Sequence, residues 1–138
     1  MNTTIKFYPR LNIWKNSSGS LVYNEQTKVS YSYNWYKLSD KIKNKVILNS
    51  YRYSVTTASQ VRCMREKFNK ENTAFIEIEA PRGLGDLSSS YQLYQSRLVS
   101  LNEKLNKPRI RKTTIAKIKQ DIKNVEQKIK LVQKLMKA

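Results

Sequence analysis

Apolar and polar side chains alternate along several short segments in the first part of the chain, which is typical of β-strands that bury one face. Residues 5–8 form a short apolar segment that Pro9 ends. Residues 11–24 contain two apolar segments around a polar turn with one glycine, a pattern that predicts a β-hairpin. Residues 46–57 and 73–80 predict two further strands. We expect these strands to form a small antiparallel sheet.

The stretch KVSYSYNWYKLSD, residues 28–40, alternates most clearly. One set of its side chains is apolar and aromatic, and we expect this set to form the core side of a strand: Val29, Tyr31, Tyr33 and Trp35. The other set is mostly polar: Ser30, Ser32, Asn34 and Tyr36. We therefore expect the ring of Tyr36 to be exposed, on the opposite face from the other rings.

A helical pattern follows at residue 57. Thr57, with Gln60 three positions later, predicts a capping box at the start of a helix. Val61, Met64 and Phe68 then recur at helical spacing. We expect this helix to pack these three side chains against the sheet.

The last third of the chain has the spacing of two heptad seams. The first seam comprises Leu87, Tyr91, Tyr94, Leu98, Leu101 and Leu105. The second comprises Ile115, Ile118, Ile122, Val125, Ile129, Val132 and Met136. Pro108 lies between them, and proline disrupts the interior of a helix. We expect an antiparallel hairpin of two helices; one long helix that pairs with another chain is the alternative.

Together these elements predict an α+β fold. A small antiparallel sheet with one packed helix is expected over residues 1–82, and a basic, coiled-coil-like helical hairpin over residues 87–138. The sequence PRGLGD contains one proline and two glycines between these regions. We interpret residues 83–86 within it as a hinge.

Charge is the strongest global feature of the chain. Its 138 residues include 27 lysines and arginines against 10 aspartates and glutamates, a formal net charge of +17. Both ends are basic, with +7 over residues 1–57 and +10 over residues 87–138, and the middle is neutral. Self-repulsion of this size favours an anionic partner, such as nucleic acid, a nucleoprotein or an anionic membrane.

Most of the C-terminal charge lies on the last predicted helix and the turn before it. With the apolar seam inward, Lys123, Lys130 and Lys137 fall seven residues apart on one outer line, with Lys134 beside them. Such a line suits contact with a phosphate backbone. An ordinary solvated face is the alternative, but that kind of face mixes charges of both signs. The predicted anion-binding residues are Lys107, Arg109, Arg111, Lys112, Lys117, Lys119, Lys123, Lys130, Lys134 and Lys137.

Four residues in the sheet region are candidates for stacking on nucleic-acid bases: Tyr36, Tyr51, Arg52 and Tyr53. Tyr36 qualifies through its expected exposure, and the other two rings flank an arginine. Cross-strand packing within the sheet is the alternative, which the alternation favours for most rings of the chain.

No arrangement of residues indicates catalysis. The chain has no histidine and one cysteine, which excludes histidine-based catalysis, the usual zinc sites and an intrachain disulfide. Glu77 and Glu79 share a strand face but lack the further carboxylates of a two-metal nuclease, so we expect a solvated or salt-bridged face. Cys63 is expected to be packed and unreactive. We predict no enzyme activity, no metal and no cofactor.

Residues 30–68 resemble short uncharacterised reading frames of phages and other mobile elements. The resemblance rests on a Tyr-Ser-x-Thr-Thr step that passes from a strand into a helix. The matching positions are Tyr53, Ser54, Val55, Thr56 and Thr57, with Ser32, Tyr33 and Asn34 upstream. Such proteins often have a histidine soon after the threonines, and this chain has none. The resemblance implies a phage or plasmid origin and a compact α+β unit, and it implies no activity.

We predict a non-enzymatic protein of a mobile element that binds the phosphate backbone of DNA or RNA with little sequence preference. The alternative is an anti-defence, anti-CRISPR-like inhibitor that binds a host nucleoprotein complex, and a ribosomal or virion component is a third class. No apolar segment approaches the roughly 20 residues that span a bilayer, and the N-terminus lacks the apolar region of a secretory signal. We expect a cytoplasmic protein, either a monomer or a coiled-coil dimer, with no membrane partner and no small-molecule substrate.

Overall fold

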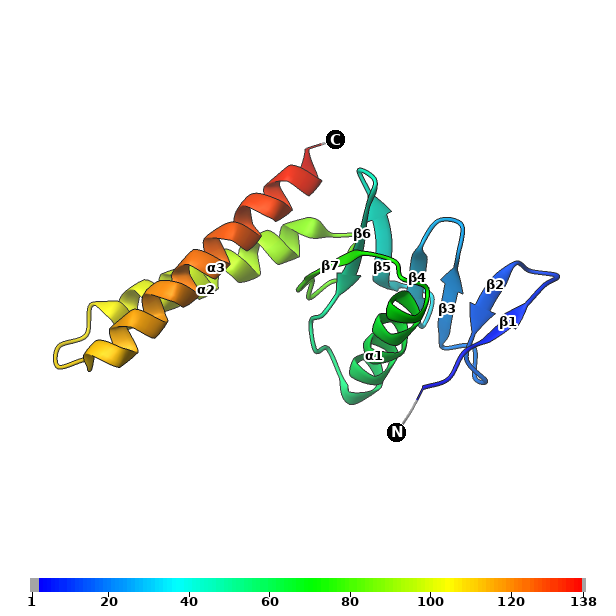
Figure 1. Ribbon diagram of the computed structural model, residues 1–138, viewed down its shortest axis with the longest axis horizontal. Coiled ribbons are helices and arrows are strands. Elements are labelled where there is room, and N and C mark those ends of the chain that lie inside the picture. Colours follow the sequence, from blue (N-terminus) through cyan, green and yellow to red (C-terminus); the bar gives the residue numbers. More distant parts are fainter. Residues whose placement is uncertain (1–2, 138) are drawn as a thin grey trace. The chain divides into compact units, whose positions relative to one another are not determined.

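A computed structural model describes residues 3–137, and the chain divides into two compact units (Figure 1). The first, Met1–Asp86, is called the sheet unit here, and the second, Leu87–Ala138, is called the hairpin unit. The predicted α+β fold is confirmed: the sheet unit carries one packed helix, and the hairpin unit consists of two helices.

The sheet has seven strands, arranged in the order in which they follow along the chain. They are β1 (Lys6–Tyr8), β2 (Ile13–Lys15), β3 (Leu21–Asn24), β4 (Val29–Ser32), β5 (Tyr36–Ile42), β6 (Lys45–Asn49) and β7 (Phe75–Ile78). Neighbouring strands are antiparallel from β1 to β6, as predicted, but β6 and β7 are parallel. A parallel pair needs a long crossover connection, and helix α1 (Val55–Lys70) lies within it.

Helix α1 begins earlier than predicted. The N-cap is Ser54 and not Thr57, because the Ser54 hydroxyl accepts a hydrogen bond from the Thr57 backbone N–H at 3.1 Å. The Thr57 hydroxyl in turn accepts from the Ser54 N–H at 2.8 Å, which completes a capping box. The preceding strand, predicted to reach residue 57, ends at Asn49.

The core of the sheet unit lies between α1 and one face of the sheet. Val61, Met64 and Phe68 of α1 are buried there, which confirms the predicted helix face. The Phe68 ring meets the Tyr23 ring edge-on at 5.8 Å between centroids. Strands β3, β5 and β6 supply most of the opposing buried side chains: Leu21, Tyr23, Tyr36, Leu38, Val46 and Leu48.

The predicted faces of residues 28–40 are wrong at most positions, although Asn34 is exposed as expected and Val29 and Tyr31 are half-buried. Ser30 and Ser32 are fully buried, whereas Tyr33 and Trp35 are exposed. Tyr36, which we expected to be exposed, is 1% exposed and belongs to the core. A tight turn separates β4 from β5 and changes the alternation, so the residues before and after it do not form one continuous strand.

A hydrogen-bonded polar layer explains how the serine face can be buried. The Ser32 hydroxyl donates to Gln60 Oε1 of α1 at 2.5 Å, and Gln60 Nε2 donates to the Ser20 hydroxyl at 3.2 Å. The hydroxyls of Ser30 and Ser39 are 2.7 Å apart, and Ser39 donates to the Lys28 carbonyl. Buried polar groups with such partners avoid the penalty of an unmade hydrogen bond.

Asn49, at the end of β6, holds the chain that follows β7. Its Nδ2 donates to the Ala80 carbonyl and its Oδ1 accepts from the Ala80 N–H, both at 2.9 Å. The Tyr36 hydroxyl donates to the same carbonyl at 3.0 Å. The side chain of Asn49 is fully buried. Its two hydrogen bonds with the Ala80 backbone continue the β6–β7 pairing beyond the last backbone pair, Asn49 with Ile78.

We expect Asn49→Asp to lower the free energy of unfolding by about 2 kcal/mol, because a carboxylate cannot donate to the Ala80 carbonyl and is costly to bury. Urea denaturation followed by tryptophan fluorescence measures the loss. Asn44→Asp, on the exposed β5–β6 turn, makes the same chemical change and should alter stability by less than about 0.5 kcal/mol. Equal losses in the two variants would show that Asn49 does not hold this segment.

The segment interpreted as a hinge packs partly into the sheet unit. The Leu84 N–H donates to the Lys37 carbonyl at 3.0 Å, and the Leu84 side chain is buried. Gly83 has a φ of +86°, and a Cβ at this position would lie 2.9 Å from the Lys37 backbone nitrogen. This position therefore requires glycine for both conformation and space. The boundary between the two units falls after Asp86.

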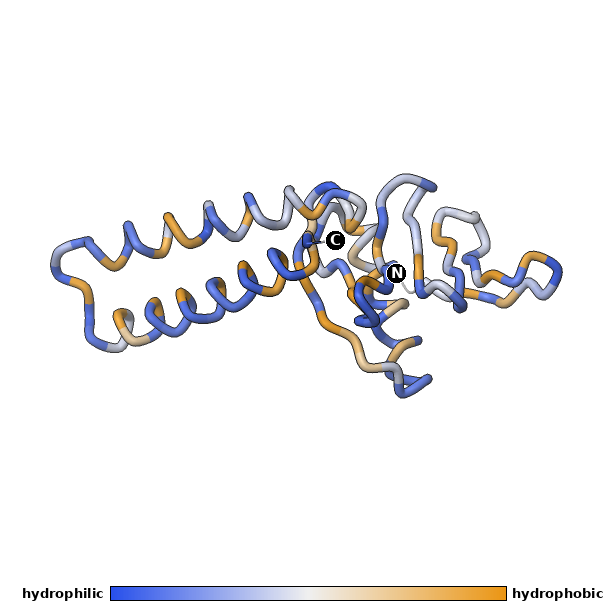
Figure 2. Tube along the Cα trace, turned by 90° about the horizontal axis from the view of Figure 1, so that it is seen from above, coloured by the Kyte–Doolittle hydropathy of each residue, from blue (hydrophilic) through white to orange (hydrophobic). Residues whose placement is uncertain are grey.

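The hairpin unit consists of α2 (Leu87–Leu105) and α3 (Lys112–Met136), which pack along each other. Hydrophobic residues recur at regular intervals along both helices (Figure 2). The buried hydrophobic positions are Tyr94 on α2 and Ile118, Val125, Ile129, Val132 and Leu135 on α3; Ser89 and Ser90 of α2 are also buried. The two helices are thus paired within the chain, as expected for the predicted hairpin.

The end of the second seam differs from the prediction. Met136 was expected to be an inward position, but it is 44% exposed and Leu135 is buried instead. Met136 borders an open hollow of about 340 Å³ that Tyr91, Gln133 and Lys137 also line. The seam is therefore not closed around Met136 at this end of the hairpin unit.

Candidate nucleic-acid interface

The predicted anion-binding residues all lie on α3 or on the loop that joins it to α2. Every one of the ten is exposed. On α3 the seven are Lys112, Lys117, Lys119, Lys123, Lys130, Lys134 and Lys137, the last as its C-cap. Lys107, Arg109 and Arg111 belong to the loop.

Six of these lysines share one side of α3. At about 100° per residue around the helix axis, they fall within a sector about 60° wide. We call this set the lysine stripe: Lys112, Lys119, Lys123, Lys130, Lys134 and Lys137. The stripe extends about 38 Å along the helix, at 1.5 Å per residue. Lys117 lies about 140° around the axis from the stripe and points to a different flank.

The packing of α3 sets the direction of the stripe. Ile118, Val125 and Ile129 are buried against the hairpin partner, and the stripe lies on a flank turned away from them. Among the acidic residues of α3, Asp121 is on the side opposite the stripe and Glu126 is at the edge of the stripe. The stripe therefore has a strong local excess of positive charge.

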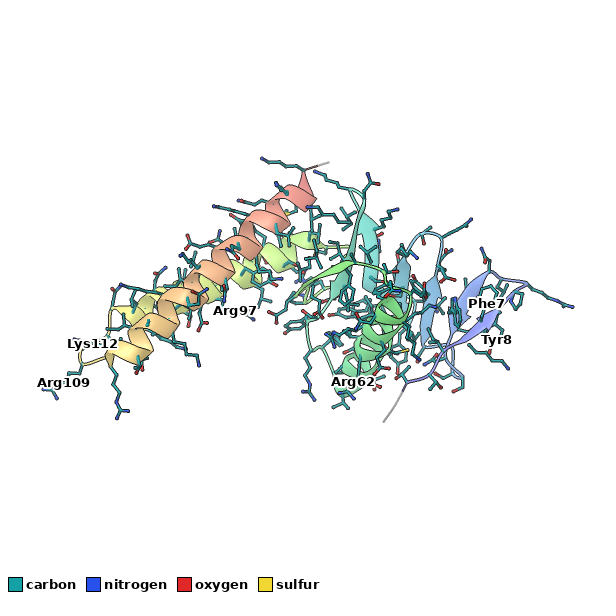
Figure 3. All side chains as sticks on the ribbon, viewed as in Figure 1. Phe7, Tyr8, Arg62, Arg97, Arg109 and Lys112 are labelled. Carbon is teal, nitrogen blue, oxygen red and sulfur yellow. The ribbon has the colours of Figure 1, made fainter. Side chains whose placement is uncertain are left out.

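The loop end of the hairpin adds further charge and backbone donors. Arg109 and Lys112 project from this end (Figure 3). Arg111 is the N-cap of α3 and makes no side-chain hydrogen bond to the helix, whose first turn contains no acidic residue. The first N–H groups of a helix attract anions when no cap satisfies them. The loop end and the stripe thus favour the same kind of ligand.

The four predicted stacking residues have different environments. Tyr36 is buried, so its predicted role in stacking on the surface is wrong; burial also raises the pKa of its hydroxyl above the ordinary value. Tyr51 is half-buried, and Arg52 and Tyr53 are exposed. Sequence reasoning missed Trp35, whose ring is exposed and lies edge-on to the ring of Tyr53 at 5.8 Å.

The residues considered for chemistry are paired or buried. Glu77 forms a salt bridge with Arg65 of α1, whose Nε donates at 3.0 Å, as expected for a salt-bridged face. Burial raises the pKa of the Cys63 thiol, which disfavours the reactive thiolate. Among residues 3–137 there is no group of three or more histidine, cysteine, aspartate or glutamate residues arranged to hold a metal ion.

A cleft of about 320 Å³ between α1 and the first strands was not predicted. Lys67 lies on its wall, with its ammonium 3.6 Å from the centroid of the Trp14 ring. The same ammonium pairs with the carboxylates of Glu25 and Glu71. The cleft is also lined by Lys70 and Glu66, so its basic and acidic side chains balance and it adds no net positive charge to the basic surface.

Comparisons of the chain with protein-family models, with curated protein sequences and with solved structures found no match. Within the part of the chain that the structure describes, no helix combines the length and the apolar character needed to cross a membrane.

Proposed function

We propose that this protein is a non-enzymatic nucleic-acid-binding protein of a phage or other mobile element. It contacts the phosphate backbone with little sequence preference. The observation that carries the proposal is the lysine stripe, a line of exposed ammonium groups on one flank of α3. The resemblance of residues 30–68 to mobile-element reading frames supports the proposed origin.

The chemistry of the stripe favours backbone contact over base reading. All six of its residues are lysines, which act as point charges, whereas bidentate recognition of bases is typical of arginine. At about 3.4 Å per base pair, a stripe of about 38 Å matches roughly one turn of duplex. Each ammonium that neutralises a phosphate releases condensed counterions, which supplies affinity without sequence information.

Affinity is expected to fall steeply with salt. If the six stripe lysines each neutralise one phosphate, the binding constant should fall about 10³-fold between 50 and 200 mM salt. Fluorescence anisotropy with a labelled duplex of mixed sequence, repeated with a scrambled duplex, measures the slope and the sequence preference. Binding that does not change with salt would contradict the proposal.

A pull-down from host lysate, with and without nuclease, separates direct nucleic-acid binding from binding to a protein. We expect all partners to be lost after nuclease treatment. A host nucleoprotein subunit that remains bound would overturn the proposal in favour of the inhibitor hypothesis.

A further inference from the structure

Three aromatic residues of the sheet unit are exposed close together on two neighbouring segments. Tyr33 and Trp35 belong to the β4–β5 turn and are 58% and 56% exposed. Tyr53 lies in the connection from β6 to α1 and is 53% exposed. Trp35 and Tyr53 are in contact, and Tyr33 lies two residues before Trp35 on the same turn. The three exposed rings are called here the ring cluster.

The ring cluster is supported from below. The buried ring of Tyr36 lies 5.3 Å from the ring of Trp35 and 5.0 Å from that of Tyr53, between centroids. The Tyr36 hydroxyl is held by the Ala80 carbonyl. Trp35 and Tyr53 therefore rest on a fixed core ring, and rings positioned in this way lose little conformational entropy when a flat ligand stacks on them.

The conformation of Tyr33 is unfavourable for a tyrosine. Its φ is +53° and that of Asn34 is +64°, and the Trp35 N–H closes the turn on the Ser32 carbonyl at 3.3 Å. Positive φ at both central residues is typical of a type I′ turn, which prefers asparagine or glycine. A bulky residue in this region is strained. The β5–β6 turn has the same conformation with Lys43 and Asn44 at its centre, so the distinguishing feature of the β4–β5 turn is the exposed aromatic ring and not the strain alone.

Packing accounts for only part of the ring cluster. The contacts of Trp35 and Tyr53 with Tyr36 help to hold the β4–β5 turn against the β6–α1 connection. They do not explain the exposed ring of Tyr33, because asparagine or glycine would form the same turn with less strain. A ligand that uses the ring would explain its presence.

We propose that the ring cluster stacks unpaired nucleobases, so that the protein binds single-stranded segments in preference to duplex. The inference rests on the proposed nucleic-acid-binding function. Exposed aromatic rings beside basic residues are the usual platform for single strands. Arg52 is exposed next to Tyr53, and Lys37 follows the β4–β5 turn, where it forms a salt bridge with Asp40. The other basic side chains of residues 28–53 lie at the opposite ends of β4 and β5, so Arg52 is the basic residue that accompanies the rings. In a duplex the base faces are already stacked on each other and are closed to these rings.

An abasic strand is the sharpest probe, because it keeps the phosphates and lacks the bases. We expect the protein to bind oligo(dT) more tightly than an abasic DNA strand of equal length, by about 5- to 150-fold for each stacked base. The same comparison of oligo(dT) with oligo(U) distinguishes DNA from RNA as the source of the bases. Anisotropy titrations at one fixed salt concentration measure the affinities for four ligands: oligo(dT), the abasic strand, oligo(U) and a duplex.

Tyr33→Asn is the most informative variant, because asparagine suits the left-handed conformation. We expect its unfolding midpoint to be equal to or higher than that of the original protein, while its affinity for oligo(dT) falls at least fivefold. Its affinity for the abasic strand and for duplex should not change. Trp35→Leu should give the same selective loss. Leu11→Asn, on the exposed β1–β2 turn, is the matched control and should change none of these affinities.

The outcomes separate the two proposals. A selective loss for oligo(dT) in Tyr33→Asn supports base stacking. Unchanged oligo(dT) affinity in both Tyr33→Asn and Trp35→Leu, with tight binding to the abasic strand, would overturn base stacking and leave backbone binding intact. The absence of binding to any of the strands at low salt would overturn both proposals.

Discussion

Replacing Lys123 and Lys130 together with glutamine is expected to weaken nucleic-acid binding about 50-fold at 0.1 M salt. For each phosphate contact, the binding constant changes by about 0.9 logarithmic units per decade of salt concentration. One contact therefore raises the binding constant roughly eightfold at 0.1 M salt relative to 1 M salt. The slope of the logarithm of the binding constant against the logarithm of the salt concentration should become shallower by the contribution of about two phosphate contacts. Anisotropy titrations at four or more salt concentrations measure both quantities.

The control for this prediction removes the same charge away from the stripe. Lys104 of α2 and Lys117 of α3 are both exposed, and neither belongs to the lysine stripe. Replacing both with glutamine should change affinity less than about threefold, since long-range effects of net charge are screened beyond roughly 10 Å at 0.1 M salt. If this control loses as much affinity as the stripe variant, net charge and not the stripe governs binding.

Phe68→Ala is expected to have the largest effect on stability, a loss of about 3–5 kcal/mol in the free energy of unfolding of the sheet unit. The Phe68 side chain is fully buried, and its ring contacts Tyr23 and Phe75 at 5.8 and 5.6 Å between centroids. Truncation removes these contacts and leaves a cavity under α1. Small domains are stable by only about 5–15 kcal/mol, so the loss is a large fraction of the total.

Tryptophan fluorescence is a suitable measurement, because both tryptophans of the chain, Trp14 and Trp35, belong to the sheet unit. Urea denaturation should show a lower midpoint for Phe68→Ala. Phe7→Ala is the matched control: Phe7 lies on edge strand β1, is 36% exposed and contacts the Trp14 ring at 5.3 Å between centroids, outside the core under α1. Its loss should therefore be clearly smaller than that of Phe68→Ala, about 1–2 kcal/mol. Similar midpoints for the two variants would mean that α1 does not depend on Phe68.

Much of the helical structure followed from periodicity along the chain. The spacing of Val61, Met64 and Phe68 identified the buried face of α1. The predicted seam positions of α2 and α3 are buried or half-buried, with the exception of Met136. Pro108 marked the break between the two helices. These predictions succeeded because an apolar stripe at helical spacing is a local property, and burying it requires only that a partner be present.

The strands were harder to interpret. Alternation along residues 28–36 showed the period of two, but it did not show which set of side chains faces the core. The apolar set looked like the buried one, yet Ser32 is buried because Gln60, 28 residues later, receives its hydrogen bond. Asn34, which tolerates a positive φ, was the local signal of the turn that exposes Trp35.

The connection after β6 was also decided by distant contacts. The strand pattern continued to residue 57, but Asn49 turns its side chain to Ala80 and Ser54 caps α1 instead. The parallel pairing of β6 with β7 follows from the same arrangement, since α1 returns the chain to the same end of the sheet.

The sequence by itself determined the α+β class, the two heptad seams and the excess of positive charge on α3, because composition and helical periodicity are local quantities. The tertiary structure decided that α2 and α3 pair within the chain. Only the tertiary structure decided which rings of residues 28–40 are buried. The choice depends on hydrogen bonds and packing with Gln60 and Ala80, which are far along the chain. It placed Tyr36 in the core and brought Trp35 next to Tyr53 on the surface.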